Sequence, residues 1–274
     1  MAQKGMELFN NGTHSCISFH DLVTGDGIQA NQFLVVDNDH AALIDPGGDL
    51  TFTPLKIAIS SLVLLKDLDY VIASHQDPDI IASLGRWLSN TDSKVVTSAL
   101  WSRFLPHLIS DFTGHQIKDG FGSRIISLRD QGGRIPLGNS ELIAVPAHFL
   151  HSVGNFHFYD PVSKILFTGD VGASVGSGHD QVTDFDAQLP YMTGFHRRYM
   201  CSNRVCRLWA DMVRDMDVEM IVPQHGPAFK GRAMVARFLD WFSELRCGID
   251  LLTQRNYRPD VPQLDEFEDE LAAG

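Results

Sequence analysis

Histidine and aspartate residues recur directly after strand-like runs of this chain, and this pattern constrains the fold more than any other feature. The run LDYVIAS (68–74) leads into His75, and Asp77 and Asp79 follow at spacings of two. Later in the chain four more such residues follow strand-like runs, namely His148, His151, Asp170 and His225. Because loops at strand ends are where many folds gather reactive side chains, we expect these residues to meet at one edge of a sheet.

The runs between these residues alternate between strand and helix patterns. NQFLVVD (31–37) and HAALID (40–45) predict a hairpin, and DPGG (45–48) predicts the turn that ends it. Pro54 favours a helix over 53–65 in which it takes the first helical position. We also expect strands at 68–74, 94–99 and 218–224, and several more within 123–170. Helices are expected after Asp77 and over 196–216 and 230–252, with an amphipathic segment at 101–109. The stretch 171–191 is expected to be an irregular loop.

These elements fall into two similar halves, each beginning with hairpins and ending in helices, and this order favours a β-sandwich flanked by helices. The chain of 274 residues is predicted to form one domain over 1–252, followed by an acidic tail at 253–274. The four cysteines form no CxxC pair and are expected to be packed free thiols.

Composition excludes several classes of function. The net charge of −12 argues against a nucleic-acid partner, which needs clustered Lys and Arg. No apolar run approaches the roughly 20 residues that span a bilayer, and the first residues lack the pattern of a secretory signal. A cytoplasmic protein without a membrane partner is therefore expected.

The side chains that follow the strands suit a metal centre. Imidazole nitrogen and carboxylate oxygen are ligands for borderline divalent metals. In extended backbone His75, Asp77 and Asp79 point to the same side, so they can be shared between two ions. Asp170 can bridge such a pair with its two oxygens, at the roughly 3.5–4 Å separation usual for two-metal sites.

The order of the motifs resembles the metallo-β-lactamase superfamily. HxDxD at 75–79, FLH at 149–151, TGD at 168–170 and QHG at 224–226 follow one another as in that superfamily, whose usual first motif is HxHxDH. The hairpin and ALIDPGG segment are also similar to its amino-terminal part. The resemblance covers about residues 30–250 and implies a metallo-β-lactamase-like αββα sandwich, an α/β fold.

Asp77 stands where zinc hydrolases of the superfamily have histidine, and this resembles the flavodiiron oxygen and nitric oxide reductases, whose pattern is HxExDH. The resemblance implies two iron ions, with zinc as the alternative. It assigns one iron to His75, Asp77 and His151, the other to Asp79 and His225, and a bridge to Asp170. His148 is then a neighbour of the site.

Ile80 departs from the family pattern, because it stands at the position of a metal-binding histidine. The second iron is therefore expected to be one protein ligand short. The vacancy can take water, O₂ or a histidine from elsewhere, for which His148, His179 and His196 are the candidates.

The flavodoxin-like domain of flavodiiron proteins has no counterpart in this chain, so no flavin is expected within it. The resemblance then points to oxygen-binding diiron proteins linked to bacterial sensing. We expect O₂ or NO as the ligand, and an oxygen sensor, a carrier, or a reductase that needs an external electron donor. A signalling protein is a possible partner, and the oligomeric state is left open. A dinuclear hydrolase of a thioester, lactone or phosphodiester is the alternative.

Overall fold

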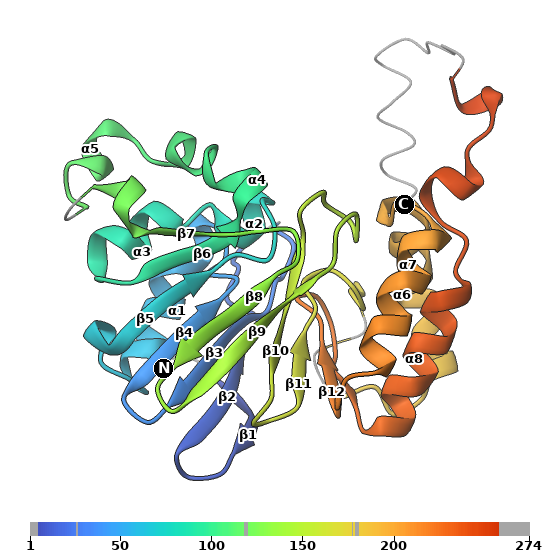
Figure 1. Ribbon diagram of the computed structural model, residues 1–274, viewed down its shortest axis with the longest axis horizontal. Coiled ribbons are helices and arrows are strands. Elements are labelled where there is room, and N and C mark those ends of the chain that lie inside the picture. Colours follow the sequence, from blue (N-terminus) through green and yellow to red (C-terminus); the bar gives the residue numbers. More distant parts are fainter. Residues whose placement is uncertain (1–4, 26, 118–119, 177, 179–180, 258–274) are drawn as a thin grey trace.

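Two β-sheets lie face to face in the middle of the molecule, and helices cover the outer face of each (Figure 1). The computed structural model describes residues 5–257 except 26, 118–119, 177 and 179–180. The predicted αββα sandwich is therefore confirmed. Within the described ranges, no helix combines the length and apolar character needed to cross a bilayer.

The first sheet has seven strands that follow one another in chain order. They are β1 (Met6–Asn10), β2 (His14–Phe19), β3 (Gln32–Asp37), β4 (His40–Ile44), β5 (Leu68–Ile72), β6 (Lys94–Ser98) and β7 (Ile125–Leu128). The β3–β4 pair is the predicted hairpin, and β4 to β7 run parallel. The β1–β2 hairpin precedes the first strand that the sequence predicts.

The second sheet has six strands in the order β13-β12-β11-β10-β9-β8. They are β8 (Gly133–Leu137), β9 (Ser140–Pro146), β10 (Phe156–Asp160), β11 (Ile165–Phe167), β12 (Met220–Val222) and β13 (Phe229–Lys230). The pairs β9–β10 and β10–β11 are antiparallel, whereas β11–β12 is parallel. As a result β9, β11 and β12 end at the same edge of the sheet.

The helices form two groups on opposite sides of the sandwich (Figure 1). The first group is α1 (Asp49–Ser60), α2 (Pro78–Ile81), α3 (Leu84–Asn90), α4 (Ala99–Ser102) and α5 (Asp111–Gly114), and the second is α6 (Phe185–Tyr199), α7 (Asn203–Arg214) and α8 (Arg232–Glu244). Short 3₁₀ turns are η1 (Leu65–Asp67), η2 (Leu105–Leu108), η3 (Phe121–Arg124), η4 (Gly248–Leu251) and η5 (Gln254–Tyr257).

Helix α1 begins four residues earlier than the pattern around Pro54 predicts. Gly48 is its N-cap in extended conformation and Asp49 lies in the first turn, where a carboxylate is favoured by the helix dipole. Pro54 therefore lies inside the helix, not at its first position. The prediction of the start was wrong because the turn at DPGG ends sooner than expected.

The segment predicted as one loop and one helix over 171–216 also differs. Helix α6 already begins at Phe185, because the side chain of Asp184 accepts hydrogen bonds from the backbone N–H groups of Asp186 and Ala187. The chain then leaves the helical conformation at Met200, and α7 begins at Asn203. Likewise α8 ends at Glu244, and η4 follows as a separate turn.

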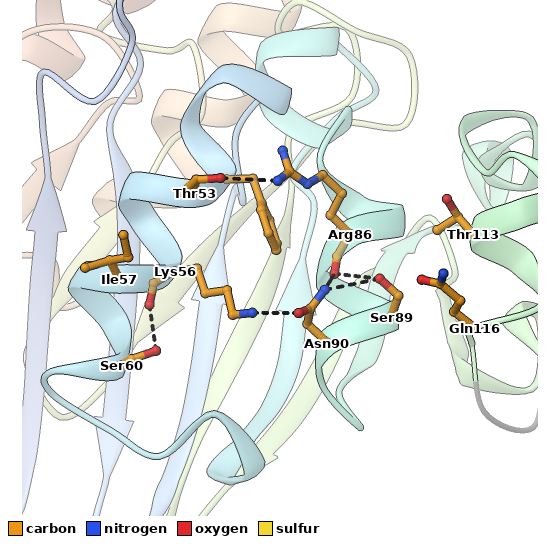
Figure 2. A pocket seen from close by; sticks show the side chains of 10 residues that line it. Thr53, Lys56, Ile57, Ser60, Arg86, Ser89, Asn90, Thr113 and Gln116 are labelled. Atoms are coloured by element: carbon orange, nitrogen blue, oxygen red, sulfur yellow. Dashed lines mark hydrogen bonds between the residues drawn. The ribbon is translucent and has the colours of Figure 1, made fainter.

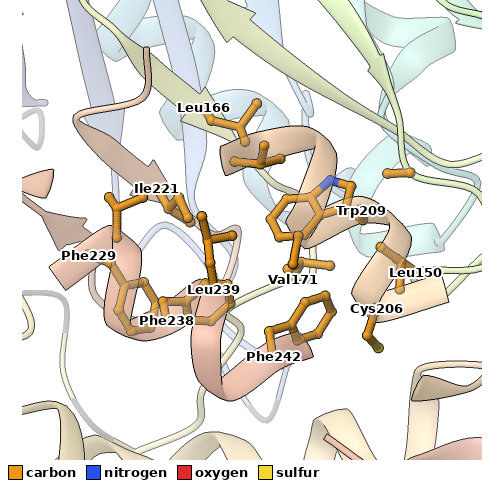
Figure 3. Packing of buried hydrophobic residues seen from close by; sticks show 14 of the residues in the cluster. Leu150, Leu166, Val171, Cys206, Trp209, Ile221, Phe229, Phe238, Leu239 and Phe242 are labelled. Atoms are coloured by element: carbon orange, nitrogen blue, oxygen red, sulfur yellow. The ribbon is translucent and has the colours of Figure 1, made fainter. Parts of the chain in front are cut away.

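Three layers of apolar side chains hold the sandwich together. One lies between the two sheets, and another packs the first sheet against α1 and α3. On β3, Phe33 and Val35 face the second sheet while Leu34 faces the helices, as the period of two requires. The third layer packs the second sheet against α6 to α8, and Figure 3 shows Trp209, Phe238 and Phe242 within it.

A buried cluster of charges joins the two sheets. His14 on β2 contacts Asp37 on β3 at 3.0 Å and Asp160 on β10 at 2.9 Å. Burial lowers the pKa of an imidazole, but the bonds and charges of these carboxylates outweigh that cost and raise the pKa of His14. The cluster thus connects β2 of the first sheet with β10 of the second through the imidazole of His14.

Candidate metal centre

The predicted side chains converge at the edge where several strands end. His75 follows β5, His151 follows β9, Asp170 follows β11 and His225 follows β12, while Asp77 and Asp79 lie at the start of α2. Strands β9, β11 and β12 run parallel to one another, so the residues that follow them lie at one edge of the second sheet. His75, in the loop after β5 of the first sheet, contacts Asp170 at this edge. The site is therefore built from both sheets.

Four side chains form a first group. Nε2 of His151 lies 2.8 Å from Oδ2 of Asp170 and 3.3 Å from Oδ2 of Asp77. Nε2 of His75 lies 3.7 Å from Oδ2 of Asp170 and 3.6 Å from Oδ2 of Asp77. All four donor atoms lie within 4.8 Å of one another, which is close enough to surround one metal ion.

A second group uses the other oxygen of the same aspartate. Nε2 of His225 lies 3.4 Å from Oδ1 of Asp170 and 3.4 Å from Oδ2 of Asp79. Asp170 thus turns one oxygen toward each group. This is the arrangement that a carboxylate bridging two ions requires.

Two atoms of the cluster are buried and have no hydrogen-bond partner. They are Nε2 of His75 and Oδ1 of Asp170. A buried polar atom without a partner costs free energy unless a ligand or ion satisfies it. Both atoms face the centre of the cluster, so the donor set fits bound cations.

In the absence of a metal ion, protons on the neighbouring histidines balance the negative charge of the buried carboxylates. Burial disfavours the charged imidazole, but Asp170 and Asp77 raise the pKa of His151 to about 9. In the same way Asp170 and Asp79 raise the pKa of His225 to about 10 against the effect of burial. Burial opposes ionisation of Asp170 as well, yet the three neighbouring histidines hold its pKa well below the usual range.

Hydrogen bonds behind the histidines aim the Nε2 atoms at the centre. Nδ1 of His75 contacts Oγ of Ser74 at 2.9 Å, and that hydroxyl donates to Oδ2 of Asp45 at 3.0 Å. Nδ1 of His225 contacts the carbonyl oxygen of Gln29 at 2.7 Å. Such contacts fix the ring orientation of metal-binding histidines.

Asp45, the first residue of the DPGG turn, supports the loop that carries His75 through its carboxylate. Its Oδ1 accepts the backbone N–H of Ser74 at 2.8 Å. Burial raises the pKa of Asp45 to about 6, although its neighbours Ser74 and His75 act in the opposite direction.

The close approach of the loops depends on glycine. Gly226, next to His225, has a φ of +84°, and a Cβ there would lie 2.1 Å from Oγ of Ser174. Neither the conformation nor the space suits another residue. The QHG motif therefore keeps the His225 loop against the Asp170 loop.

The two described candidates for an extra ligand, His148 and His196, do not join the cluster. His148 uses Nε2 for a contact of 2.8 Å with the carbonyl oxygen of Asp130. His196 is buried; its Nδ1 contacts the carbonyl oxygen of Met192 and its Nε2 accepts the N–H of Gly172. Both ring nitrogens are thus engaged, so His196 does not supply a ligand in this structure. His179 lies outside the described residues.

Ile80 is fully buried in the apolar layer between the first sheet and its helices. It is absent from the residues that line the cavity above the cluster. The position next to Asp79 therefore contributes to the core and provides no donor atom toward the second group.

A cavity of about 590 Å³ opens above the cluster. Asp77, Asp79, His151, Asp170 and His225 form its floor. Its rim is apolar, with Ile28, Leu50 and Val175 respectively 65%, 59% and 67% exposed. The cluster is therefore reached from solvent through an apolar opening.

Two aromatic residues beside the cluster were not predicted. Phe195 and Tyr199 stack with ring centroids 4.8 Å apart, and the Tyr199 ring lies 5.7 Å from the His151 ring. Phe195 lies just before the predicted helix, which begins only at residue 196, whereas Tyr199 lies within it. Recognition of Asp184 as an N-cap would have placed them on one helix face.

A second cavity, between α1 and α3, is of a different kind. Figure 2 shows Lys56 and Arg86 within it, and Arg86 also lies 4.1 Å from the Phe52 ring centroid. The described residues that line it, among them Thr53, Ser89 and Asn90, offer no imidazole or carboxylate. It has no donor set for a transition metal.

The sandwich and the His/Asp cluster define a metallo-β-lactamase-like domain of the superfamily's carboxylate-rich type. More specifically, the chain belongs to the ODP family of beta-lactamase-like proteins, because the family model described as "ODP family beta lactamase" matches residues 28–226.

Solved structures of the chemotaxis sensor ODP support this membership. The apo state from T. denticola is 36% identical, with a TM-score of 0.79, and covers 93% of this chain and 99% of its own. A structure of the same sensor described as a peroxy diiron species has a TM-score of 0.80 at 36% identity and covers 93% of this chain and 100% of its own.

More distant proteins share the fold. A flavo di-iron protein of Thermotoga maritima is 20% identical with a TM-score of 0.70, and the match covers 87% of this chain and 60% of that chain. Among curated proteins, an uncharacterized protein of Methanocaldococcus jannaschii is 25% identical over 81% of this chain and 55% of its own length. A putative diflavin flavoprotein of Synechocystis is 28% identical over 73% of this chain and 33% of its own. The chain thus spans about half or less of these curated relatives.

Proposed function

We propose that this chain is a non-haem diiron protein that binds O₂ and acts as an oxygen sensor. The observation that carries the proposal is the single aspartate, Asp170, whose two oxygens face two separate His/Asp groups. The 36% identity to a chemotaxis sensor over nearly the whole chain supports the same reading.

In this proposal His75, Asp77 and His151 hold one iron, Asp79 and His225 hold the other, and Asp170 bridges them. The unpartnered Nε2 of His75 and Oδ1 of Asp170 support the presence of ions at both places. Two ferrous ions, when bound, would supply the electrons that O₂ needs to bind.

The side chains around the cluster set its selectivity. Among the residues that the structure describes, the second group has fewer protein donors than the first, because Ile80 lies in the core and His196 is engaged elsewhere. A ligand can therefore enter on the side of Asp79 and His225. The apolar rim formed by residues such as Ile28 and Val175 favours a small uncharged gas, O₂ or NO, over an anion.

We favour a sensor over a reductase or a carrier. The solved structures that match nearly the whole of this chain are of a chemotaxis sensor, whereas continuous reduction of O₂ or NO would need an electron donor. A reductase would therefore depend on an external donor protein, whereas a sensor needs only a signalling partner that detects the bound state.

Anaerobic iron loading followed by addition of O₂ tests this proposal. The iron-loaded protein should develop a new charge-transfer band in the visible spectrum, and the His151→Ala variant, which retains the other side chains, should not. The absence of a new band from protein that holds iron would contradict the proposal. Preferential retention of zinc with turnover of a phosphodiester would instead favour a dinuclear hydrolase.

A further inference from the structure

An apolar groove of about 300 Å³ runs along α7 on the outside of the second sheet. One wall is Phe149 and Leu150, and the other is formed by Val205, Leu208 and Trp209. Leu150 and Trp209 are buried and belong to the apolar core between the second sheet and α6 to α8, in which Figure 3 shows both. Although Phe149 and Leu208 are apolar, they are 46% and 63% exposed, so the groove leaves apolar surface uncovered.

Exposed arginines lie on α7, which forms one wall of the groove, and in the last turn of α6. The stretch 191–210 contains four arginines and no carboxylate, in a chain of net charge −12. Arg204 and Arg207 lie on α7 beside Val205 and Leu208, while Arg197 and Arg198 lie in the last turn of α6. Among the residues that the structure describes, no carboxylate forms an ion pair with any of the four. The groove therefore fits a partner that is acidic on one side and apolar on the other.

The chain itself contains such a sequence. Residues 264–271 read LDEFEDEL, with acidic residues at 265, 266, 268, 269 and 270. Leu264, Phe267 and Leu271 are spaced by three and four, which would place them on one side of a helix. Apolar residues on one side and carboxylates on the other match the groove and its arginines.

The chain that leads to this sequence runs beside the α6–α7 turn. The N–H of Ile249 donates to the carbonyl oxygen of Cys201 at 2.8 Å, and Oδ2 of Asp250 accepts the N–H of Asn203 at 2.6 Å. These bonds fix the segment after α8 against the α6–α7 turn. From Tyr257, the last described residue, the seven further residues to Leu264 can span roughly 23 Å.

We propose that residues 264–271 of this chain dock in the α7 groove, with Leu264, Phe267 and Leu271 on its apolar walls and the carboxylates beside Arg204 and Arg207. An amphipathic segment in an apolar groove is a common mode of peptide recognition. Because the segment is tethered, its local concentration reaches about the millimolar range, and modest affinity suffices.

Docking would also affect a loop that contributes to the metal centre. Phe149 and Leu150 directly precede His151, and the carbonyl oxygen of Phe149 accepts the N–H of Cys201 from the α6–α7 turn. A segment in the groove would therefore restrain the loop that carries His151. Only this regulatory consequence rests on the proposed function; the docking itself does not require metal.

Hydrogen–deuterium exchange of the full-length, metal-free protein tests the docking. Replacement of the three apolar residues by serine (L264S/F267S/L271S) should raise amide exchange at residues 146–150 and 205–212 at least fivefold. These changes lie outside the described domain, so loss of the fold does not explain such a result. R204E/R207E should have the same effect, and K66E/K94E, an equal change of charge at two exposed lysines of the first half, should have none.

A variant in which the charges of both partners are reversed completes the test. R204E/R207E combined with lysine at the five acidic positions of 264–271 should restore the protection. Unchanged exchange in the serine variant or in R204E/R207E would overturn the proposal. Protection that disappears on dilution would also overturn it, because that result would indicate docking between two chains. Since no metal is present, none of these outcomes bears on iron or O₂ binding.

Discussion

Nε2 of His151 lies 2.8 Å from Oδ2 of Asp170, while the other oxygen of the same carboxylate faces His225. One buried aspartate thus connects two groups of side chains that come from strand ends far apart in the sequence. The two groups can be altered separately, and the shared residue can be altered alone. The predictions below use this property.

Asp170→Asn should disrupt both halves of the centre. An amide presents only one carbonyl oxygen and no negative charge, so it cannot bridge two cations as a carboxylate does. We expect bound iron to fall from about two ions to fewer than one per chain, measured by elemental analysis after anaerobic loading. Asp130→Asn, at an exposed aspartate of which only the backbone oxygen contacts His148, should retain the full content. Equal iron in both variants would contradict the bridging role.

Ser74→Ala should weaken metal binding without removal of a ligand. The Ser74 hydroxyl connects Nδ1 of His75 with the Asp45 carboxylate and so fixes the ring orientation. Loss of such supporting contacts costs about 10- to 100-fold in metal affinity. Competition with a chelator provides the measurement, and Ser60→Ala on the exposed side of α1 is the control. An affinity equal to that of the control would show that the hydroxyl has no positioning role.

Metal affinity should rise with pH, because protons occupy the site when metal is absent. The pKa of His151 is raised to about 9 and that of His225 to about 10, so both are protonated at neutral pH. Metal binding requires the neutral imidazole. Between pH 7 and 9 we expect the affinity to rise about tenfold per pH unit for each proton displaced. Calorimetry in buffers of different ionisation enthalpy counts the released protons; release of none would be inconsistent with these pKa values.

His14→Ala should destabilise the metal-free protein. Removal of one partner from a buried charge cluster leaves Asp37 and Asp160 uncompensated, at a cost of about 3–5 kcal/mol. Urea unfolding measures this difference. His40→Ala, at an exposed histidine that contacts Asp69 at 2.7 Å, should cost less than about 1 kcal/mol. Similar losses in both variants would argue against a stabilising role for the buried cluster.

The same cluster gives a pH dependence whose sign can be worked out. The pKa of His14 is raised, so its stabilisation is complete below the unfolded value near 6.5 and is lost as pH rises through the folded value. The pKa values of Asp37 and Asp160 are lowered, so their stabilisation is complete above about pH 4 and is lost as pH falls through their folded values. The difference between the wild type and His14→Ala should therefore be largest between about pH 4 and 6.5.

The positions of the site residues could be predicted because they follow strands. A short apolar run identifies a buried strand, and the residue after it lies at the sheet edge whatever the exact length of the strand. This is why His75, Asp170 and His225 come together as predicted. The assignment of each side chain to one of two irons stays a prediction.

Other features depend on contacts that the sequence pattern does not reveal. Helix α6 is stabilised by the Asp184 cap and by packing against α8, so a stretch rich in polar residues is helical from Phe185. The engagement of His196 with Met192 and Gly172 follows from that helix and could not be predicted without it. The contact of His14 with Asp160 joins residues 146 positions apart, and neither lies in a motif.

Anomalous X-ray scattering at the iron edge, from crystals loaded with ferrous iron without oxygen, tests the central claim most directly. The account predicts two peaks on either side of Asp170, roughly 3.5–4 Å apart, one near His75, Asp77 and His151 and the other near Asp79 and His225. A single peak, or iron bound away from these side chains in protein that retains its fold, would contradict it.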